Sequence, residues 1–410
     1  MRTFEENLEK YAELAVKVGV NIQPGQTLFV NADISSAPFV RKVVKKAYEV
    51  GAKLVQVEWS DEVVTRTRYD YASDESFEYF PKWRADMLEQ AYKEGAAALH
   101  IVSMNPELLK GVDPNKISRL ARVAGEASKE YMKYPRGFKI SWSIVAVPSV
   151  AWAGKVFPEV SSSEEQVEKL WNAIFDATRI TQDNPIEAWI NHNQNLNNKV
   201  DYLNNENFQY LHYTAPGTDL TIELAEKHLW VGAESIDDSG SSFVANMPTE
   251  EVFTTPLKTG VNGTVRSTKP LSYAGNVINN FSLTFKDGRI VDFQAEEGYE
   301  ALQKLIETDE GSHYLGEVAL VPHDSPISNT NILFYNTLFD ENASNHLAIG
   351  SSYTFTIQDG NDMSEQDLTD NGINQSVTHV DFMIGSGDMD IDGIKKDGTV
   401  VPLFRKGNWV

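Results

Sequence analysis

A histidine and an aspartate two positions apart are the residues whose spacing most directly suggests chemistry. His379 and Asp381 lie in the segment THVDFMIG at 378–385, which has the composition of a β-strand. Alternate side chains of a strand point to the same face, so the imidazole and the carboxylate would lie about 7 Å apart along it. They could bind one metal ion, or one each of two ions, while Val380 and Phe382 pack into the core. By itself the pair also fits a surface ion pair.

Two further candidates lie upstream in apolar or small-residue surroundings. Glu317 interrupts the apolar run YLGEVALVP at 314–322. If buried, a lone carboxylate must be paired, neutralised or bound to metal, whereas on the surface it needs no special explanation. His346 lies in ENASNHLAIGSSY at 341–353, where small neighbours would let a substrate or metal approach, and Tyr353 ends this segment.

Adjacent carboxylates form a fourth element in NMPTEEVFTTP at 246–256. Glu250 and Glu251 follow Pro248 and lead into an apolar pair. In an extended chain neighbouring side chains point to opposite sides, so one glutamate could reach a site while the other stays behind it or in solvent. An ordinary exposed turn is the alternative.

Other motifs do not meet the requirements of a known site. DMDIDG at 388–393 matches the opening of a calcium-binding loop, but Thr399 stands where that loop needs a glutamate. The sequence has no glycine-rich phosphate-binding motif, which argues against a dinucleotide or P-loop site. His100 lies in a buried-strand pattern and His192 in a polar context, so we expect both to be structural or exposed.

Composition narrows the classes of function. The 410 residues predict two to three domains, and 36 basic against 59 acidic residues give a net charge of −23 that would repel nucleic acid. Without cysteine, any metal must bind His, Asp and Glu. No apolar run approaches the roughly 20 residues of a membrane span. We therefore expect a soluble cytoplasmic protein that binds neither nucleic acid nor membranes.

The periodicity of apolar residues predicts two domains. Residues 3–18 form a helix with Thr3 and Glu6 as a capping box, and strand-type and helical runs alternate up to residue 179. This predicts an α/β N-terminal domain over 1–190, with a mainly parallel sheet and helices on both faces. Asn-rich stretches at 191–199 and 203–207 predict turns at the boundary. Residues 191–410 predict a mixed, strand-rich α+β domain, with a hairpin turn at Asp287-Gly288 and helices near 298–307 and 329–339.

Four segments in a fixed order resemble the signatures of the thermophilic-type metalloaminopeptidases, the family of aminopeptidase T, aminopeptidase S and PepS. They are NMPTEEVFTTP, GEVALVP, SNHLAIGSSY and THVDFMIGSGDMDIDG, and the resemblance extends over the whole chain. It implies a cytoplasmic, homodimeric exopeptidase that acts on peptides with a free N-terminus. It also implies a pair of divalent ions (Zn, Co, Mn or Mg) in the C-terminal domain, with Tyr353 as an active-site residue and with the ligands Glu251, Glu317, His346, His379 and Asp381.

The chemistry of these residue types is consistent with that resemblance. Two divalent ions can activate water and polarise a carbonyl, and no thiolate is required. Glu250 is then the candidate general base and Tyr353 the candidate stabiliser of the tetrahedral oxyanion. A dinuclear phosphoesterase is the alternative enzyme, although no basic phosphate clamp accompanies the motifs, and a binding protein with solvated acidic clusters is a third possibility.

Overall fold

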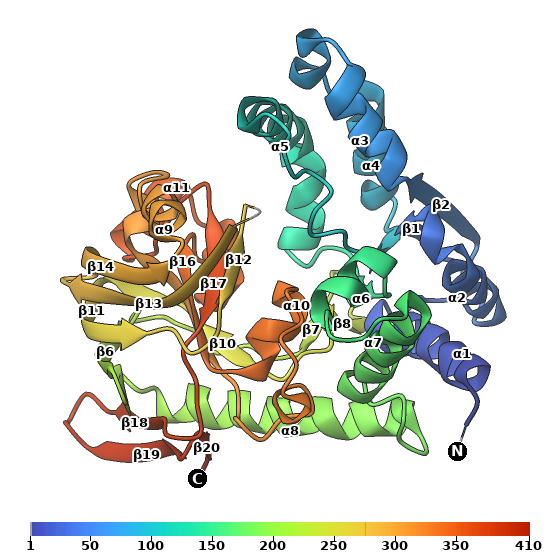
Figure 1. The fold of residues 1–410 in the computed structure, drawn as a ribbon. Coiled ribbons are helices and arrows are strands. Elements are labelled where there is room, and N and C mark those ends of the chain that lie inside the picture. The colour runs from blue at the N-terminus through green and yellow to red at the C-terminus, as the bar shows by residue number, and fades with distance from the viewer. Residues whose placement is uncertain (1, 275) are drawn as a thin grey trace. The chain divides into compact units, whose positions relative to one another are not determined.

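The computed structural model describes residues 2–274 and 276–410, which form two compact units (Figure 1). The first unit comprises the chain up to Asn191 together with Glu234–Met247. The second comprises His192–Ala233 and Pro248–Val410. Among the described residues, none of the helices combines the length and apolar character that crossing a bilayer requires.

A five-stranded parallel sheet with helices around it forms the first unit, as predicted. Its apolar strands at 27–33 and 97–102 are largely buried, which is typical of a parallel sheet covered by helices. The strands in spatial order are β2 (Leu54–Ser60), β1 (Thr27–Asp33), β3 (Ala97–Val102), β4 (Trp142–Ala146) and β9 (Asn246–Met247). The helices are α1 (Phe4–Leu14), α2 (Ala37–Glu49), α3 (Glu62–Tyr71), α4 (Lys82–Lys93), α5 (Pro114–Arg136), α6 (Val150–Val156) and α7 (Ser163–Ala177).

The first helix begins at the predicted capping box. The backbone N–H of Glu6 donates to the hydroxyl of Thr3 at 3.3 Å, and the N–H of Thr3 donates to the carboxylate of Glu6 at 2.7 Å. The α-helical part ends earlier than predicted, because Ala15–Gly19 forms a π-helical turn.

Residues 234–247 belong to the first unit, although they lie inside the predicted 191–410 domain. Strands β7 (Glu234–Ile236) and β8 (Ser242–Val244) pair with each other, and β9 then pairs with β4. A single boundary near residue 190 does not describe this return, because the strand that completes the sheet is distant in sequence from the other four.

The Asn-rich segment predicted as turns is a helix, α8 (Pro185–Glu206). Trp189, Leu196 and Leu203 recur every seven residues, and all three are buried. This apolar stripe explains the helix, because packing of one face outweighs the modest helix propensity of asparagine. The turn prediction was wrong because it weighed residue type above this periodicity.

The second unit is built mainly from antiparallel strands, as predicted. Asp287 and Gly288 have φ of 49° and 80° and form the expected two-residue turn of a hairpin. Its nine-stranded sheet contains β5 (Tyr210–Ala215), β6 (Thr218–Leu224), β11 (Pro256–Arg266), β12 (Leu271–Tyr273), β13 (Asn276–Lys286), β14 (Arg289–Glu297), β18 (Asp390–Ile394), β19 (Val400–Arg405) and β20 (Asn408–Trp409).

A smaller antiparallel sheet of four strands lies in the same unit. Its order is β10 (Val252–Thr254), β15 (Leu315–Leu320), β16 (His346–Gly350) and β17 (His379–Met383). Strands β15 and β16 are buried along their whole length. The four strands pair side by side, and one face of this sheet carries the candidate site described below.

Short helices complete the second unit. Helix α9 (Tyr299–Ile306) lies where it was predicted, and α11 (Glu365–Asp370) was not predicted. The helix expected over 329–339 is only α10 (Thr337–Asp340). It is short because the N–H groups of Phe334 and Asn336 donate to the carboxylate of Asp340, which holds the preceding chain in a turn.

Candidate metal centre

The four-stranded sheet brings the sequence-predicted ligands together. Ala348, in the middle of β16, pairs with Glu317 of β15 on one side and with Asp381 of β17 on the other. His346 and His379 begin β16 and β17, and Glu251 directly precedes β10. The small side chain of Ala348 leaves space between the two carboxylates.

A β-bulge turns Glu317 toward this face. Leu315 pairs with Ile349, whereas Glu317 pairs with Ala348, so the two residues of β15 point to opposite faces although they are two positions apart. Gly316 lies at the bulge, where an added Cβ would come 2.3 Å from the carbonyl oxygen of Gly350. Glycine is therefore required here, and the bulge explains how an apolar strand can direct one carboxylate into a site.

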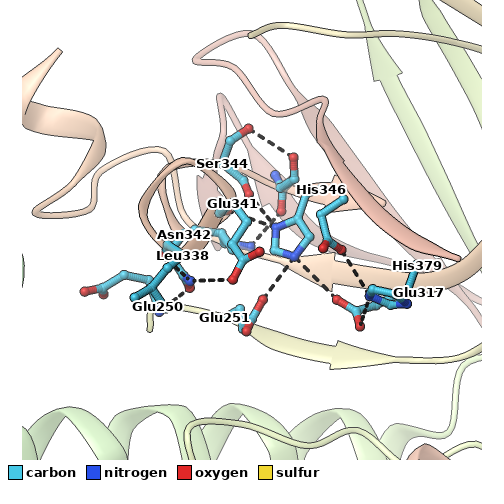
Figure 2. A network of polar contacts seen from close by, with 12 residues as sticks. Glu250, Glu251, Glu317, Leu338, Glu341, Asn342, Ser344, His346 and His379 are labelled. Atoms are coloured by element: carbon cyan, nitrogen blue, oxygen red, sulfur yellow. Dashed lines mark hydrogen bonds and ion pairs between the residues drawn. The ribbon is translucent and has the colours of Figure 1, made fainter. Parts of the chain in front are cut away.

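His346 is held in one orientation by backbone carbonyls. Its Nδ1 lies 2.9 Å from the carbonyl oxygen of Glu341 and 3.1 Å from that of Ser344. Because a carbonyl only accepts, Nδ1 must carry the proton. Nε2 then faces the carboxylates of Glu251 at 3.0 Å and Glu317 at 3.4 Å (Figure 2). This is how a metal-ligating histidine is usually oriented.

His379 repeats the same arrangement on the neighbouring strand. Its Nδ1 donates to the carbonyl oxygen of Ser351 at 2.7 Å. Its Nε2 lies 3.4 Å from Oδ1 of Asp381 and 3.7 Å from Oε2 of Glu317. Oδ1 of Asp381 is buried and accepts no hydrogen bond from any described residue, which is the state expected of an oxygen that binds a cation.

Glu317 is common to two groups of candidate ligands. One group is Glu251, Glu317 and His346, and the other is Glu317, His379 and Asp381; within each, the ligand atoms lie within 4.8 Å of one another. Oε1 of Glu317 faces His346, and Oε2 faces His379. The arrangement can therefore hold two cations that share one carboxylate.

Glu341 adds a carboxylate that the sequence analysis did not identify. Figure 2 shows its side chain beside the ring of His346 and close to Glu251. Oε1 of Glu341 lies 3.4 Å from Nδ2 of Asn342, whose Oδ1 accepts the N–H of Glu250 at 2.8 Å. No periodic sequence pattern identified Glu341 as a candidate, because it lies in a short 3₁₀ turn (Glu341–Ala343) rather than on a strand.

The electrostatics of the cluster favour bound positive charge. Burial, and then the charges of Asp381 and Glu251, raise the pKa of Glu341 well above its usual value. Burial opposes protonation of His346, but Glu251 and Glu317 raise its pKa well above the usual value. Carboxylates and imidazoles are ligands that divalent ions commonly bind, and bound cations would compensate the buried negative charge, so the residues present fit divalent metal ions.

Tyr353 lies at the edge of the cluster. Its ring centroid is 4.7 Å from that of His379, and 39% of the residue is exposed. Burial of the hydroxyl and the nearby carboxylates, Glu317 first, raise the pKa of Tyr353 well above 10. The phenol is therefore protonated at neutral pH and can donate a hydrogen bond.

The side chain of Glu250 is buried but points away from the cluster of candidate ligands. Figure 2 shows its side chain pointing away from His346, on the side opposite to Glu251. Its Oε2 lies 3.6 Å from Nε2 of His192, which also lies 2.8 Å from the carbonyl oxygen of Thr249. The neighbouring glutamates thus diverge, as expected for an extended chain.

The family of the chain follows from comparison with known proteins. A family model described as Thermophilic metalloprotease (M29) matches residues 4–409. The chain belongs to this family.

Relatives of the chain within this family are similar to it over their full length. Aminopeptidase AmpS of Bacillus subtilis is 58% identical over 409 residues, with 100% of each chain covered. Aminopeptidase T of Thermus thermophilus is 43% identical over 410 residues, again with 100% of each chain covered. A solved structure of wild-type AmpT from Thermus thermophilus covers 100% of both chains with a TM-score of 0.94 at 42% identity.

These findings confirm the expected family, fold class and enzyme class. The chain is a metal-dependent aminopeptidase, and its fold is that of the Thermus structure. The number of metal ions and the roles of individual residues are separate questions, which the geometry of the cluster addresses.

Proposed function

We propose that the enzyme removes the N-terminal amino acid from peptides with a co-catalytic pair of divalent ions. The observation that carries this proposal is the position of Glu317, whose two oxygens face two different histidines. A carboxylate so placed suits a bridge between two ions. The proposed ligands are Glu251, Glu317, His346, His379 and Asp381.

The protein supplies orientation and charge to this reaction. When bound, two divalent ions would lower the pKa of water and polarise the scissile carbonyl. The backbone carbonyls behind His346 and His379 fix both rings with Nε2 directed inward. The surplus of carboxylates would also attract the ammonium group of a peptide N-terminus, which would restrict cleavage to the first residue.

Tyr353 is the proposed stabiliser of the tetrahedral oxyanion. It is half exposed, next to His379, and keeps its proton at neutral pH. A neutral donor at the edge of the cluster can hydrogen-bond the developing negative charge without competing for a proton.

Two carboxylates are candidates for the general base. Glu250 would have to rotate away from His192 to reach a substrate, whereas Glu341 already lies beside His346 and Glu251. We therefore favour Glu341, as a proton acceptor or as a further ligand, and Glu250 is the second candidate. The phosphoesterase alternative is not favoured, because the relatives are aminopeptidases.

Comparing hydrolysis of leucine 4-nitroanilide and 4-nitrophenyl phosphate, before and after chelation, tests this function. We expect cleavage of the anilide only, loss of activity on chelation, and recovery with a divalent metal. N-acetylated leucine 4-nitroanilide should resist cleavage, because it has no free amine. Cleavage of the phosphate ester, or anilide cleavage that survives chelation, would contradict the proposal.

Three finer expectations also belong to this proposal, on the family resemblance. The native ions are Zn, Co, Mn or Mg, the enzyme is a homodimer, and it acts in the cytoplasm. Elemental analysis, sedimentation at micromolar concentration and cell fractionation test them in turn. A monomer in sedimentation would remove the dimer from the proposal without affecting the metal centre.

A further inference from the structure

A cavity of about 310 Å³ lies in the first unit, at the carboxyl edge of the parallel sheet. Its walls come from the ends of β1, β2 and β3 and from the start of α3. None of the residues that line it belongs to the metal centre, which lies in the second unit. The cavity is therefore not explained by the proposed peptidase site.

The topology of the sheet makes this position a favourable one for a ligand. Strand β1 has β2 on one side and β3 on the other. After β2 is added on one side of β1, the chain crosses over and adds β3 on the other side, so the order of strands reverses at β1. In open α/β sheets, such a reversal leaves a crevice outside the carboxyl ends of the strands, where ligands bind. Residues from both flanking strands line this crevice, including Asp33 of β1 and His100 of β3.

One polar side chain of the cavity has unused hydrogen-bonding capacity. Oγ of Ser103 is buried and has no hydrogen-bond partner among the described residues. Buried polar groups are normally satisfied, so this hydroxyl indicates a missing partner in the cavity. His100, which was expected to be structural or exposed, also lines the cavity, and burial lowers its pKa.

The charge of the cavity is negative. Asp33, Asp61 and Glu62 line it, together with a neutral His100, and its lining includes no lysine or arginine. The hydrogen bonds described for Asp33 and Asp61 use Oδ1 alone, as caps of the segments that follow them. Glu62 accepts from Asn105 through Oε2 alone. Each carboxylate can therefore still bind a positive group.

A metal ion does not fit this arrangement as well as an organic cation does. Groups of three or more histidine or carboxylate side chains whose ligand atoms lie within 4.8 Å of one another occur, in the described residues, only in the second unit. The carboxylates of the cavity are thus too dispersed for a single ion. A volume of about 310 Å³ instead lies at the lower end of pockets for small organic ligands.

We propose that this cavity binds a small organic ammonium ion, of the alkyl amine or diamine class. Asp33, Asp61 and Glu62 would attract the ammonium groups, and Ser103 and His100 would form hydrogen bonds with them. The apolar residues Ile101, Val102 and Leu108 also line the cavity and would contact an alkyl chain. A free amino acid is a poorer ligand, because its carboxylate would be repelled.

Calorimetric titration of the full-length, metal-loaded enzyme tests this inference. The probe is 1,4-diaminobutane, with butane-1,4-diol as the uncharged analogue and succinate as the oppositely charged one. We expect saturable binding of the diamine alone. The double variant Asp61→Asn/Glu62→Gln keeps a neutral acceptor at each position but removes both charges, and it should weaken binding by at least about tenfold.

A matched control variant separates local from general charge effects. Glu94→Gln removes an exposed carboxylate just before the amino end of β3, at the opposite edge of the sheet, and should leave diamine affinity unchanged. The anilide activity of each variant shows that it is folded. The His100 ring resonance, assigned with His100→Gln, should shift on addition of the diamine.

Three results would overturn the inference. One is the absence of saturable diamine binding at millimolar concentration. The second is unchanged affinity in the double variant, and the third is loss of diamine binding on chelation, which would locate it at the metal centre. Because anilide hydrolysis is a separate readout, failure of this inference leaves the proposed function intact, and failure of the proposed function does not affect diamine binding.

Discussion

The backbone carbonyl oxygen of Glu341 accepts a hydrogen bond from Nδ1 of His346 at 2.9 Å. One residue thereby has two functions, since its backbone fixes the imidazole while its side chain adds a carboxylate beside it (Figure 2). A change in the 3₁₀ turn that contains Glu341 would therefore disturb both the orientation of a proposed ligand and the charge of the centre.

Removing either histidine should abolish most activity while the fold is retained. In His346→Ala or His379→Ala one proposed ligand is lost, and we expect metal affinity to fall by more than about 100-fold, since even partners that only orient a ligand cost 10–100-fold. The thermal transition should fall in parallel with metal content, because ions that bind only the folded state stabilise it. His212→Ala, at an exposed Asp219 pair, is the control. Wild-type turnover at saturating metal in either variant would rule out the ligand assignment.

Glutamine substitutions should distinguish the two candidate bases. We expect Glu341→Gln to lower kcat by about 10²–10⁴-fold, the usual contribution of general acid–base catalysis, and Glu250→Gln to have the smaller effect. Measuring the pH–rate profile and metal content together separates the roles. Loss of the acidic limb with metal retained indicates a base, whereas loss of metal indicates a ligand. A larger effect of Glu250→Gln would return the base to the residue first predicted from the sequence.

Tyr353→Phe should lower kcat by about 10²–10³-fold, because it removes one donor to the oxyanion. The acidic limb of the pH–rate profile and the metal content should not change, since the phenol keeps its proton at neutral pH. Phe355→Leu, at the ring stacked on Tyr353, controls for loss of packing alone. An unchanged kcat in Tyr353→Phe would exclude the proposed role.

Protonation of Asp309 should lower the stability of the folded protein in acid. Although burial opposes it, hydrogen bonds from Val377, Ser376 and Ser312 hold the pKa of Asp309 below 3.8. A lowered folded-state pKa means that the stabilisation is present above pH 3.8 and is lost as the pH falls through the folded-state pKa. Asp309→Asn should therefore cost about 1–2 kcal/mol of unfolding free energy at pH 7 and progressively less in acid. An equal cost at pH 7 and pH 3, measured by urea unfolding, would contradict this.

The sequence could predict the sheet types, and it could indicate several of the candidate ligands, because both depend on short-range patterns. The His379-x-Asp381 spacing and the hairpin at Asp287-Gly288 follow from the two-residue period of a strand and from turn chemistry. Glu317 stood out because a charge interrupted an apolar run, although nothing in that run predicted the bulge at Gly316 that directs it.

The remaining features depend on contacts between distant segments. The Asn-rich helix α8 is stabilised by packing of Trp189, Leu196 and Leu203, which residue propensities do not report. Strand β9 joins a sheet whose other strands precede it by about a hundred residues or more. Glu341 reaches the cluster from a 3₁₀ turn, and such a turn has no periodicity that a sequence pattern could detect.

The amount of metal bound per chain tests most directly the proposal that two ions share the carboxylate of Glu317. Elemental analysis should find two divalent ions per wild-type chain, and anomalous scattering should locate both of them in contact with Glu317. Glu317→Gln should bind fewer ions, while Glu300→Gln, an exposed change on α9, should still bind two. One ion per wild-type chain, or two ions that do not share Glu317, would contradict the account.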